Sequence, residues 1–262
     1  MTSPVLYAVD AGVATITLNR PEAMNSLDTA TKVALRDHVV HAADDPGVRA
    51  VVLTGAGRAF CVGQDLKEHA EGLAAGDADL GATVQQHYNP IAATLASMRK
   101  PVIAAVNGVA AGAGAAFAFA CDLRIVADTA GFNLAFAAIG LSCDSGSSWT
   151  LPRLVGWARA RELLLMPRTV SADEALNLGL ATEVVPAHTV VNRAGELARE
   201  LAAGPTLAYG AIRRALAFSA THELAESLAE EAELMRFTGG TEDHRGAVAA
   251  FLAKQPAEFR AR

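Results

Sequence analysis

Residues 102–144 read VIAAVNGVAAGAGAAFAFACDLRIVADTAGFNLAFAAIGLSCD. A strand-like apolar run, Val102–Val106, breaks at Asn107–Gly108, and small residues then lead into an apolar helix that ends near Cys121. A second strand-like run, Leu123–Ala127, follows it. This order of strand, small-residue turn, helix and strand predicts a tightly packed βαβ crossover in an α/β fold.

The small-residue turn Gly108–Ala116 also predicts a binding feature. Backbone with almost no side chains can approach a ligand closely, and the start of a helix adds partial positive charge at the same place. These properties are typical of a site for an anion or an oxyanion. The stretch then delivers one carboxylate, Asp144, in the loop CDSGSSW. Asp144 could act as an acid/base, or it could cap the apolar helix that follows.

The composition limits the possible classes of protein. With 262 residues, 52% of them hydrophobic and 19% charged, the chain can bury a large core as one main domain, without a disulfide or metal. A net charge of −6 and the absence of any Lys/Arg run argue against nucleic acid and an anionic membrane as main partners. We therefore expect a small-molecule partner and no metal site.

The cysteines and the apolar runs bear on the compartment. The three cysteines have no CxxC spacing, and their apolar or small neighbours predict that all are buried, which fits a reducing compartment. They are Cys61, Cys121 and Cys143. No basic-then-apolar leader and no uncharged run of membrane-spanning length is seen. We expect a cytoplasmic protein.

Strands and helices alternate early in the chain, and helices dominate late. Strands are expected at residues 5–9, 13–18, 49–54 and 183–185, and helices at 26–43, 84–98, 175–178, 189–202, 205–217, 224–236 and 244–254. Gly63 should mark a sharp turn that points the N–H of Gln64 inward. The segment Glu71–Ala82 has no clear period, and we expect a mobile surface loop over the ligand mouth.

The chain resembles the crotonase superfamily, the enoyl-CoA hydratases and isomerases. The stretches that carry the resemblance run in the family's order over essentially the whole chain: NRPEAMNSL (Asn19–Leu27), AFCVGQDL (Ala59–Leu66), the run from Lys100 to Asp128, SADEALNLGLATEVV (Ser171–Val185) and AFLAKQPAEF (Ala250–Phe259). The resemblance implies a crotonase-like spiral of ββα units over residues 1–195. It also implies a helical region, residues 196–262, for trimerisation and active-site cover.

The resemblance further implies an acyl-CoA thioester held by two backbone N–H groups, which match Gln64 and Ala113. Coenzyme A then enters as part of the substrate, with no permanently bound cofactor. Its implied contacts are Arg58, Ala59, Val62, Gln64, Asp65, Leu66, Lys67 and Lys254. The implied acyl pocket comprises Phe132, Phe136, Ala137, Trp149 and Ala116, residues that in another fold could be plain core. The implied assembly is a homotrimer or a dimer of trimers.

The chain departs from the hydratases of this family at two positions. Ala116 and Phe136 match the two glutamates that face the substrate double bond in those enzymes, and neither can move a proton. Asp144 and the motif YNPI (Tyr88–Ile91) instead resemble the branch that contains the ring-epoxide and Δ3,Δ2-enoyl-CoA isomerases of phenylacetate breakdown. In that branch one aspartate is the acid/base. The resemblance therefore implies an isomerase that shifts a double bond, with Asp144 carrying the proton.

Other functions are weighed against this one. Enoyl-CoA hydration would lack both glutamates, and a non-catalytic acyl-CoA-binding protein would explain their loss. The 4-chlorobenzoyl-CoA dehalogenases also use an aspartate here, but Asn89 and Phe136 occupy their histidine and tryptophan positions. Dinucleotide binding is disfavoured because Phe117 stands where GxGxxG requires its third glycine. Serine hydrolysis is disfavoured because no GxSxG occurs.

Overall fold

The computed structural model describes residues 3–76 and 79–262. Its centre is a six-stranded sheet in the order β1-β2-β3-β5-β7-β10. The first two strands pair as an antiparallel hairpin, and the others are parallel. The strands are β1 Val5–Asp10, β2 Val13–Leu18, β3 Ala50–Gly55, β5 Val102–Val106, β7 Leu123–Ala127 and β10 Glu183–Val185. Its inner strands β3 and β5 are wholly buried, as their continuous apolar runs require.

A second, four-stranded sheet has the order β4-β6-β8-β9. Its strands are β4 Ala59–Cys61, β6 Val109–Ala111, β8 Gly131–Asn133 and β9 Val170–Ser171. The successive pairs β3/β4, β5/β6 and β7/β8 each send one strand to each sheet before the chain enters a helical segment. This repetition confirms the predicted spiral of ββα units.

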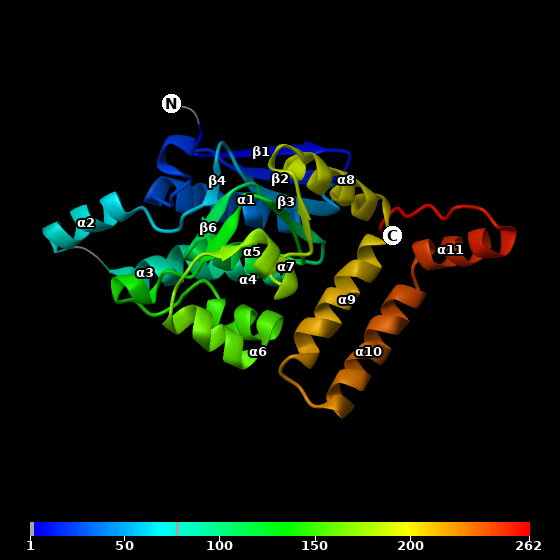
Figure 1. Ribbon diagram of the computed structural model, residues 1–262. Helices are drawn as coiled ribbons and strands as arrows, with labels where there is room; N and C mark the ends of the chain where they lie inside the picture. Colours follow the sequence, from blue (N-terminus) through cyan, green and yellow to red (C-terminus); the bar gives the residue numbers. More distant parts are fainter. Residues whose placement is uncertain (1–2, 77–78) are drawn as a thin grey trace.

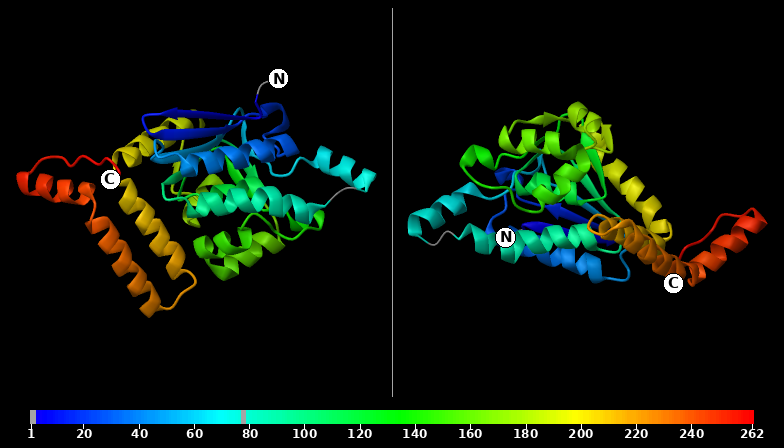
Figure 2. Two further views of the ribbon diagram at one scale, coloured as in Figure 1. Left: turned by 180° about the vertical axis from the view of Figure 1, so that it is seen from behind. Right: turned by 90° about the horizontal axis from the view of Figure 1, so that it is seen from below.

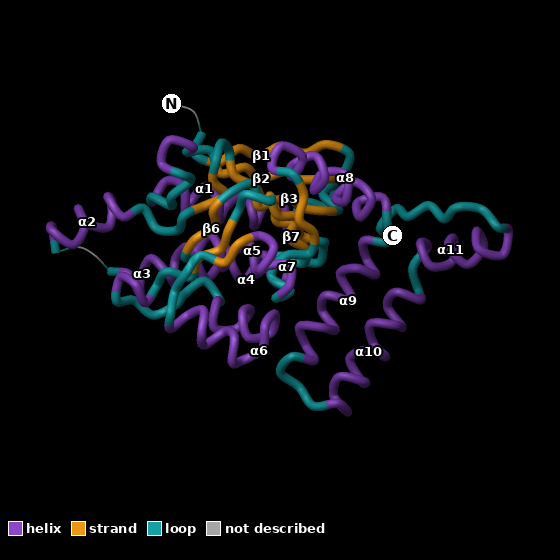
Figure 3. Tube along the Cα trace, in the orientation of Figure 1, coloured by secondary structure: helices purple, strands orange, loops and turns teal. Residues whose placement is uncertain are grey.

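Helices surround the two sheets (Figure 3). They are α1 Thr29–Asp44, α2 Leu66–Ala75, α3 Leu80–Thr83, α4 Asn89–Ser97, α5 Ala113–Ala120, α6 Ser147–Leu165, α7 Ala172–Asn177, α8 Val190–Ala203, α9 Thr206–Ser219, α10 Leu224–Gly239 and α11 Glu242–Ala253. Short turns are η1 Pro21–Ala23, the π-helical η2 Val84–Tyr88, η3 Ala137–Ile139 and η4 Ala187–Thr189. No helix in the described ranges combines the length and the apolar character needed to cross a bilayer.

The helix that follows the small-residue turn, α5, is buried along its whole length. Its residue Gly114 faces β4 so closely that an added Cβ would lie 2.2 Å from the carbonyl oxygen of Cys61. Only glycine allows this approach. Part of the crowding of small residues in the sequence is therefore a packing requirement between α5 and the small sheet.

The prediction of a mobile loop over Glu71–Ala82 is wrong for the residues that the structure describes. Helix α2 continues to Ala75 and α3 begins at Leu80, and residues 77–78 lie outside the described ranges. Each helix has an aspartate N-cap: Asp65 accepts from the backbone N–H of Lys67 and Glu68, and Asp79 from that of Ala82. The apolar period is missing because neither helix contains a buried residue.

The late helices leave the body of the molecule. Helix α8 packs on β3, β5 and β7, so the proposed boundary between residues 195 and 196 lies within a helix of the core. Helices α9, α10 and α11 then extend from the sheets on the side opposite α2, as two views agree (Figures 1 and 2). In a single chain these three helices therefore do not cover the part of the molecule near α2.

Candidate active site

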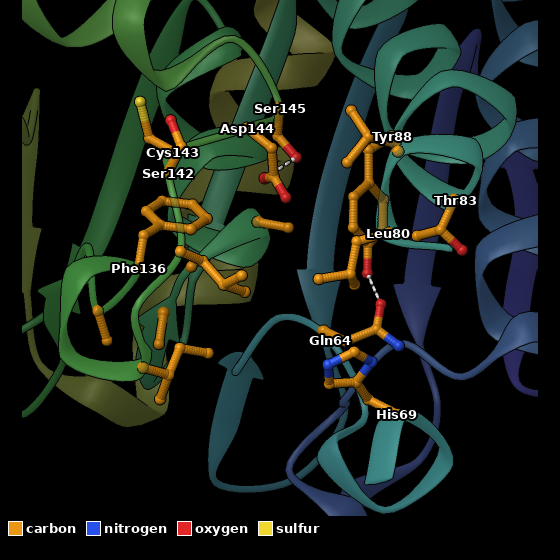
Figure 4. A pocket seen from close by; sticks show the side chains of 18 of the residues that line it. Gln64, His69, Leu80, Thr83, Tyr88, Phe136, Ser142, Cys143, Asp144 and Ser145 are labelled. Carbon is orange, nitrogen blue, oxygen red and sulfur yellow. Dashed lines mark hydrogen bonds between the residues drawn. The ribbon is translucent and has the colours of Figure 1, made fainter. Parts of the chain in front are cut away.

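A cavity of about 680 Å³ opens between the start of α5, the turn before α2, the turns α3 and η2, and the loop that precedes α6 (Figure 4). Most of its wall is apolar, and a few polar groups converge on it, which is typical of a ligand site. Its larger apolar residues are Val62, Leu66, Leu80, Val84, Phe136, Ile139 and Leu141.

The turn at Gly63 brings two backbone segments together at this cavity. Gly63 has φ +82°, and a Cβ there would lie 3.0 Å from the carbonyl oxygen of Ala111 and 3.3 Å from the nitrogen of Ala113. A side chain would therefore be strained and crowded. The predicted sharp turn is confirmed, and it sets the backbone before Gln64 directly against the start of α5.

Two backbone N–H groups, those of Gln64 and Ala113, lie at this junction. The N–H of Leu27 donates to the carbonyl of Gly63 (2.8 Å), and that of Asp65 donates to the carbonyl of Leu27 (3.2 Å). This pairing directs the N–H of Gln64 away from Leu27. Ala113 is the first residue of α5, so its N–H has no acceptor within the helix. Both Gln64 and Ala113 line the cavity.

The carboxylate of Asp144 stands in the cavity wall, across from Tyr88 (Figure 4). It accepts a hydrogen bond from the hydroxyl of Ser145 (2.8 Å). Burial raises the pKa of Asp144, and this hydrogen bond offsets only part of the rise. Among the described residues that line the cavity, Asp144 is the one carboxylate.

The helix-cap alternative for Asp144 is wrong. Helix α6 begins at Ser147 with Gly146 as its N-cap, and no side chain caps it. Asp144 contributes only its backbone carbonyl, which accepts from the N–H of Ser147 (2.9 Å). Its carboxylate is therefore not used in capping and faces the cavity with a raised proton affinity.

The other ionisable groups in the wall differ from Asp144. Burial first, and then the nearby charge of Asp144, raise the pKa of Tyr88 far above its ordinary value, so the phenol stays protonated. His69 and Cys143 also line the cavity. The prediction that all three cysteines are buried is wrong for Cys143, which is half-buried because its loop forms the cavity rim. The described residues bring no three His, Cys, Asp or Glu side chains together as a metal site.

The structure brings part of the predicted site together. Of those residues the cavity wall contains Gln64, Ala113, Asp144, Val62, Leu66 and Phe136. The remaining predicted residues lie outside the wall: Arg58, Ala59, Asp65, Lys67, Lys254, Phe132, Ala137, Trp149 and Ala116.

The predicted pocket residues outside the wall have clear structural reasons. Phe132 is only 1% exposed on β8, and its ring packs on Phe119 with centroids 5.0 Å apart, so it belongs to the core. Trp149 faces outward beneath the guanidinium of Arg153, 4.1 Å from its ring centroid. Ala116 is fully buried within α5. Ala137 begins the exposed turn η3 beside Phe136.

The predicted coenzyme A contacts are dispersed. Arg58 is exposed just before β4 and Lys67 is exposed in the first turn of α2, whereas Ala59 is buried in β4. Lys254 ends α11, on the far side of the molecule from α2 (Figure 2). In a single chain it does not approach this cavity.

Asp65, also predicted to contact coenzyme A, is engaged within the protein. Its carboxylate accepts from Ser26 Oγ (2.9 Å) and Arg20 Nη1 (3.0 Å). Burial alone would raise the pKa of Asp65, but these bonds and those from the N–H groups of the first turn of α2 lower it. The side chain is therefore an anchor for α2.

Two side chains next to the Gly63 turn were not predicted as site residues. Tyr88 was used only as part of the motif YNPI, yet its hydroxyl donates to Oε1 of Gln64. The Nζ of Lys32 lies 3.3 Å from the same oxygen. The sequence contained a signal for Lys32, because its spacing places it on the same apolar face of the helix as Leu35 and Val39. In the structure Lys32 is buried together with these two residues.

Comparisons with known proteins find relatives that match nearly the whole chain. The family model for enoyl-CoA hydratase/isomerase matches residues 8–262. The chain is 42% identical to the 1,2-epoxyphenylacetyl-CoA isomerase of Escherichia coli (strain K12) over 97% of both proteins, and 42% identical to a probable enoyl-CoA hydratase of Rhodobacter capsulatus over 98% of both. The crystal structure of a putative enoyl-CoA hydratase/isomerase from Mycobacterium abscessus superposes with a TM-score of 0.95 at 43% identity, covering 98% of this chain and 100% of that one.

Proposed function

Because the chain belongs to the enoyl-CoA hydratase/isomerase family, we propose that it acts on an acyl-CoA thioester and shifts a double bond in the acyl group. The observation that carries this proposal is the composition of the cavity. One carboxylate with a raised pKa, Asp144, shares an apolar cavity with the backbone of Gln64 and Ala113. A shift of a double bond needs one proton carrier and one oxyanion site, and no second acid.

The reaction proceeds in two proton transfers. In a 3-enoyl-CoA, Asp144 removes a proton from C2, and the electron pair of that C–H bond moves toward the thioester carbonyl to give a dienolate. The N–H groups of Gln64 and Ala113 donate to the enolate oxygen. Removing one such donor typically costs on the order of 3 kcal/mol of barrier. The protonated Asp144 then returns the proton at C4, which leaves a 2-enoyl-CoA and the original carboxylate.

The environment of Asp144 supports its role as the base. A carboxylate that is poorly solvated binds a proton more tightly. The raised pKa of Asp144 is therefore closer to the pKa of the substrate C–H group than the pKa of an ordinary aspartate is. Phe136 and Leu80 contribute apolar side chains to the wall of the same cavity (Figure 4), and such side chains offer no solvation to a carboxylate. A ring-epoxide thioester would use the same carboxylate and the same oxyanion site.

Hydration is the second candidate, since a relative is named as a probable hydratase. Adding water across a double bond requires one group to activate the water and another to protonate carbon. Each general acid or base contributes typically a hundredfold or more. The described cavity wall has Phe136 and no second carboxylate, so crotonyl-CoA hydration should be very slow or absent.

Coenzyme A is proposed to lie across the exposed face of the Gly63 turn. Arg58 and Lys67 supply positive charge for its phosphates, and the backbone from Ala59 to Leu66 borders its thiol arm. Lys254 caps the C-terminus of α11, and α11 extends on the side of the molecule opposite α2 (Figures 1 and 2). We propose that it contacts the coenzyme A bound to another copy, in a homotrimer or a dimer of trimers.

The proposal is tested with Asp144→Asn. This variant keeps the size of the side chain and cannot take a proton, so isomerisation of 3-enoyl-CoA and ring-epoxide substrates should fall by about a hundredfold or more. Its affinity for acyl-CoA, measured by calorimetry, should stay within a few-fold of wild type. Equal turnover in the two proteins would refute the role of Asp144. If the wild type binds acyl-CoA but converts neither 3-enoyl-CoA nor ring-epoxide substrates, the protein is a non-catalytic acyl-CoA-binding protein and not an isomerase.

A further inference from the structure

Lys32 is a charged side chain placed where charge is costly. It lies on α1, and its side chain is 2% exposed. Removing an ammonium from water costs several kcal/mol unless partners replace the lost solvation. The partners are Oε1 of Glu68, 3.2 Å from Nζ, and Oε1 of Gln64, 3.3 Å away. Lys32 has no role in the proposed reaction, so its burial beside the Gly63 turn needs an explanation.

Gln64 receives a second donor on the same oxygen. The hydroxyl of Tyr88, buried in η2, donates to Oε1 of Gln64 (Figure 4). The ammonium of Lys32 also lies 6.0 Å from the centroid of the Tyr88 ring. The carbonyl end of the Gln64 side chain is therefore held by groups from two separate elements, α1 and η2.

The anchoring of Lys32 extends to the N-terminus of α1. Glu68 Oε2 accepts from the backbone N–H of Thr29 (2.8 Å), and its other oxygen accepts from the Thr29 hydroxyl (3.0 Å) and from Lys32. Glu68 belongs to the first turn of α2. Lys32 thus joins α1, the start of α2 and the Gly63 turn into one hydrogen-bonded unit.

The Gln64 peptide between these anchors has little freedom. Its backbone neighbours are fixed to Leu27 on one side, and its side chain is fixed by Lys32 and Tyr88 on the other. An oxyanion donor stabilises a developing charge only when it is already aimed at that charge, and a displacement of about 1 Å can cost a hundredfold in rate.

We propose that Lys32 is a positioning residue for the oxyanion site: through the side chain of Gln64, and together with Tyr88, it holds the Gln64 N–H in line with the thioester oxygen. This rests on the proposed function, because it assumes that a thioester carbonyl occupies the cavity.

A second buried lysine provides a matched control. Lys100 is 8% exposed, and its Nζ donates to the backbone carbonyls of Ala42 (2.7 Å) and Asp45 at the opposite end of α1. It lies outside the cavity wall. Lys100 lies just before β5, so Lys100→Met and Lys32→Met each remove one buried positive charge that is packed against α1, and only the second removes a contact to Gln64.

The experiment compares wild type, Lys32→Met, Lys32→Arg and Lys100→Met. Infrared difference spectra of bound butyryl-CoA, labelled with ¹³C at the thioester carbonyl, report the hydrogen bonding of that carbonyl without any turnover. Steady-state assays with a 3-enoyl-CoA give kcat and KM, and thermal denaturation gives the stability of each variant.

We expect Lys32→Met to lose about half or more of the carbonyl frequency shift and 10- to 100-fold in kcat, with KM within threefold. Lys32→Arg, which keeps a charge and donors, should recover part of both. Lys100→Met should be destabilised but keep the full shift and kcat. A full shift and a kcat within twofold of wild type in Lys32→Met would overturn the inference, and so would equal losses in Lys100→Met. No shift in the wild type would refute the oxyanion site itself, and this inference with it.

Discussion

Two aspartates near the cavity show how surroundings decide the chemistry of one residue type. The Asp65 carboxylate accepts from Ser26, Arg20 and backbone N–H groups, which lower its pKa although burial opposes them. The Asp144 carboxylate has only Ser145 to offset burial, so its pKa is raised. A well-bonded carboxylate is a structural anchor, and a poorly bonded one is available as a base.

This difference predicts opposite effects of two similar substitutions on stability. For Asp144 the folded state binds the proton more tightly than the unfolded state. Its contribution to stability is therefore full below the unfolded pKa, about 3.9, and is lost as the pH rises through the raised folded value. Because asparagine does not ionise, Asp144→Asn should raise the melting temperature at pH 7, and the gain should vanish near pH 3. Calorimetry across pH 3 to 8 measures this.

Asp65→Asn is the matched control for that series. The lowered pKa of Asp65 means that its contribution to stability is present above the unfolded pKa and is lost as the pH falls through the folded value. The variant should therefore melt below wild type at pH 7 and approach it in acid. A melting temperature of Asp144→Asn below that of wild type at pH 7 would contradict the assignment of a poorly solvated carboxylate.

At the scale of single residues, the sequence could predict which backbone positions and which carboxylate come together at the cavity. It could not predict the direction of every side chain. Gln64, Ala113, Asp144 and Phe136 reach one cavity wall as expected. Phe132 does not, because the three-residue strand β8 turns it toward Phe119 in the core, and no periodicity can be read from so short a strand.

At the scale of elements, the oxyanion site depends on one turn and one helix start. The turn at Gly63 requires a left-handed residue directly against Ala111 and Ala113. The sequence predicted this turn from glycine alone. It could not predict that α2 would be a helix, because α2 buries no residue and is held by polar anchors at its first turn.

Gly63→Ala should disturb this junction. Its Cβ would add left-handed strain and a contact of 3.0 Å to the carbonyl oxygen of Ala111, for a cost of about 1–3 kcal/mol in the free energy of unfolding. Because the strained segment carries the N–H of Gln64, kcat should also fall by tenfold or more. Chemical denaturation and the isomerisation assay measure the two effects.

Gly179→Ala separates strain from function in this test. Gly179 has a nearly equal φ of +78°, and a Cβ there would meet only the carbonyl oxygen of Leu154, at an ordinary 3.6 Å. We expect a smaller loss of stability and an unchanged kcat. If Gly63→Ala retained full kcat, the N–H of Gln64 would not be the oxyanion donor.

At the scale of the whole molecule, the helices beyond the core carry many apolar side chains that the single chain leaves exposed. The large ones on α9 to α11 are Ile212, Leu216, Leu224, Leu228, Met235, Phe237, Val248, Phe251 and Leu252. Scattered apolar residues on a surface are normal, but a contiguous helical layer of them indicates a contact with another chain. These apolar positions can already be read in the sequence, where the last third has more of them than a short helical layer can cover itself.

We therefore expect a closed homo-oligomer, a trimer or a dimer of trimers, built with these helices. Fully burying each such side chain contributes about 1.5–3 kcal/mol, so burying several exceeds the roughly 4–15 kcal/mol that association costs. Light scattering at micromolar concentration should give three or six times the 27.1 kDa of one chain.

Replacing Phe251 and Leu252 on α11 together by aspartate should lower the mass and weaken acyl-CoA binding, because Lys254 would leave the neighbouring cavity. Val40→Asp, an exposed apolar position on α1, should change neither property. A wild-type mass near 27.1 kDa would refute the assembly.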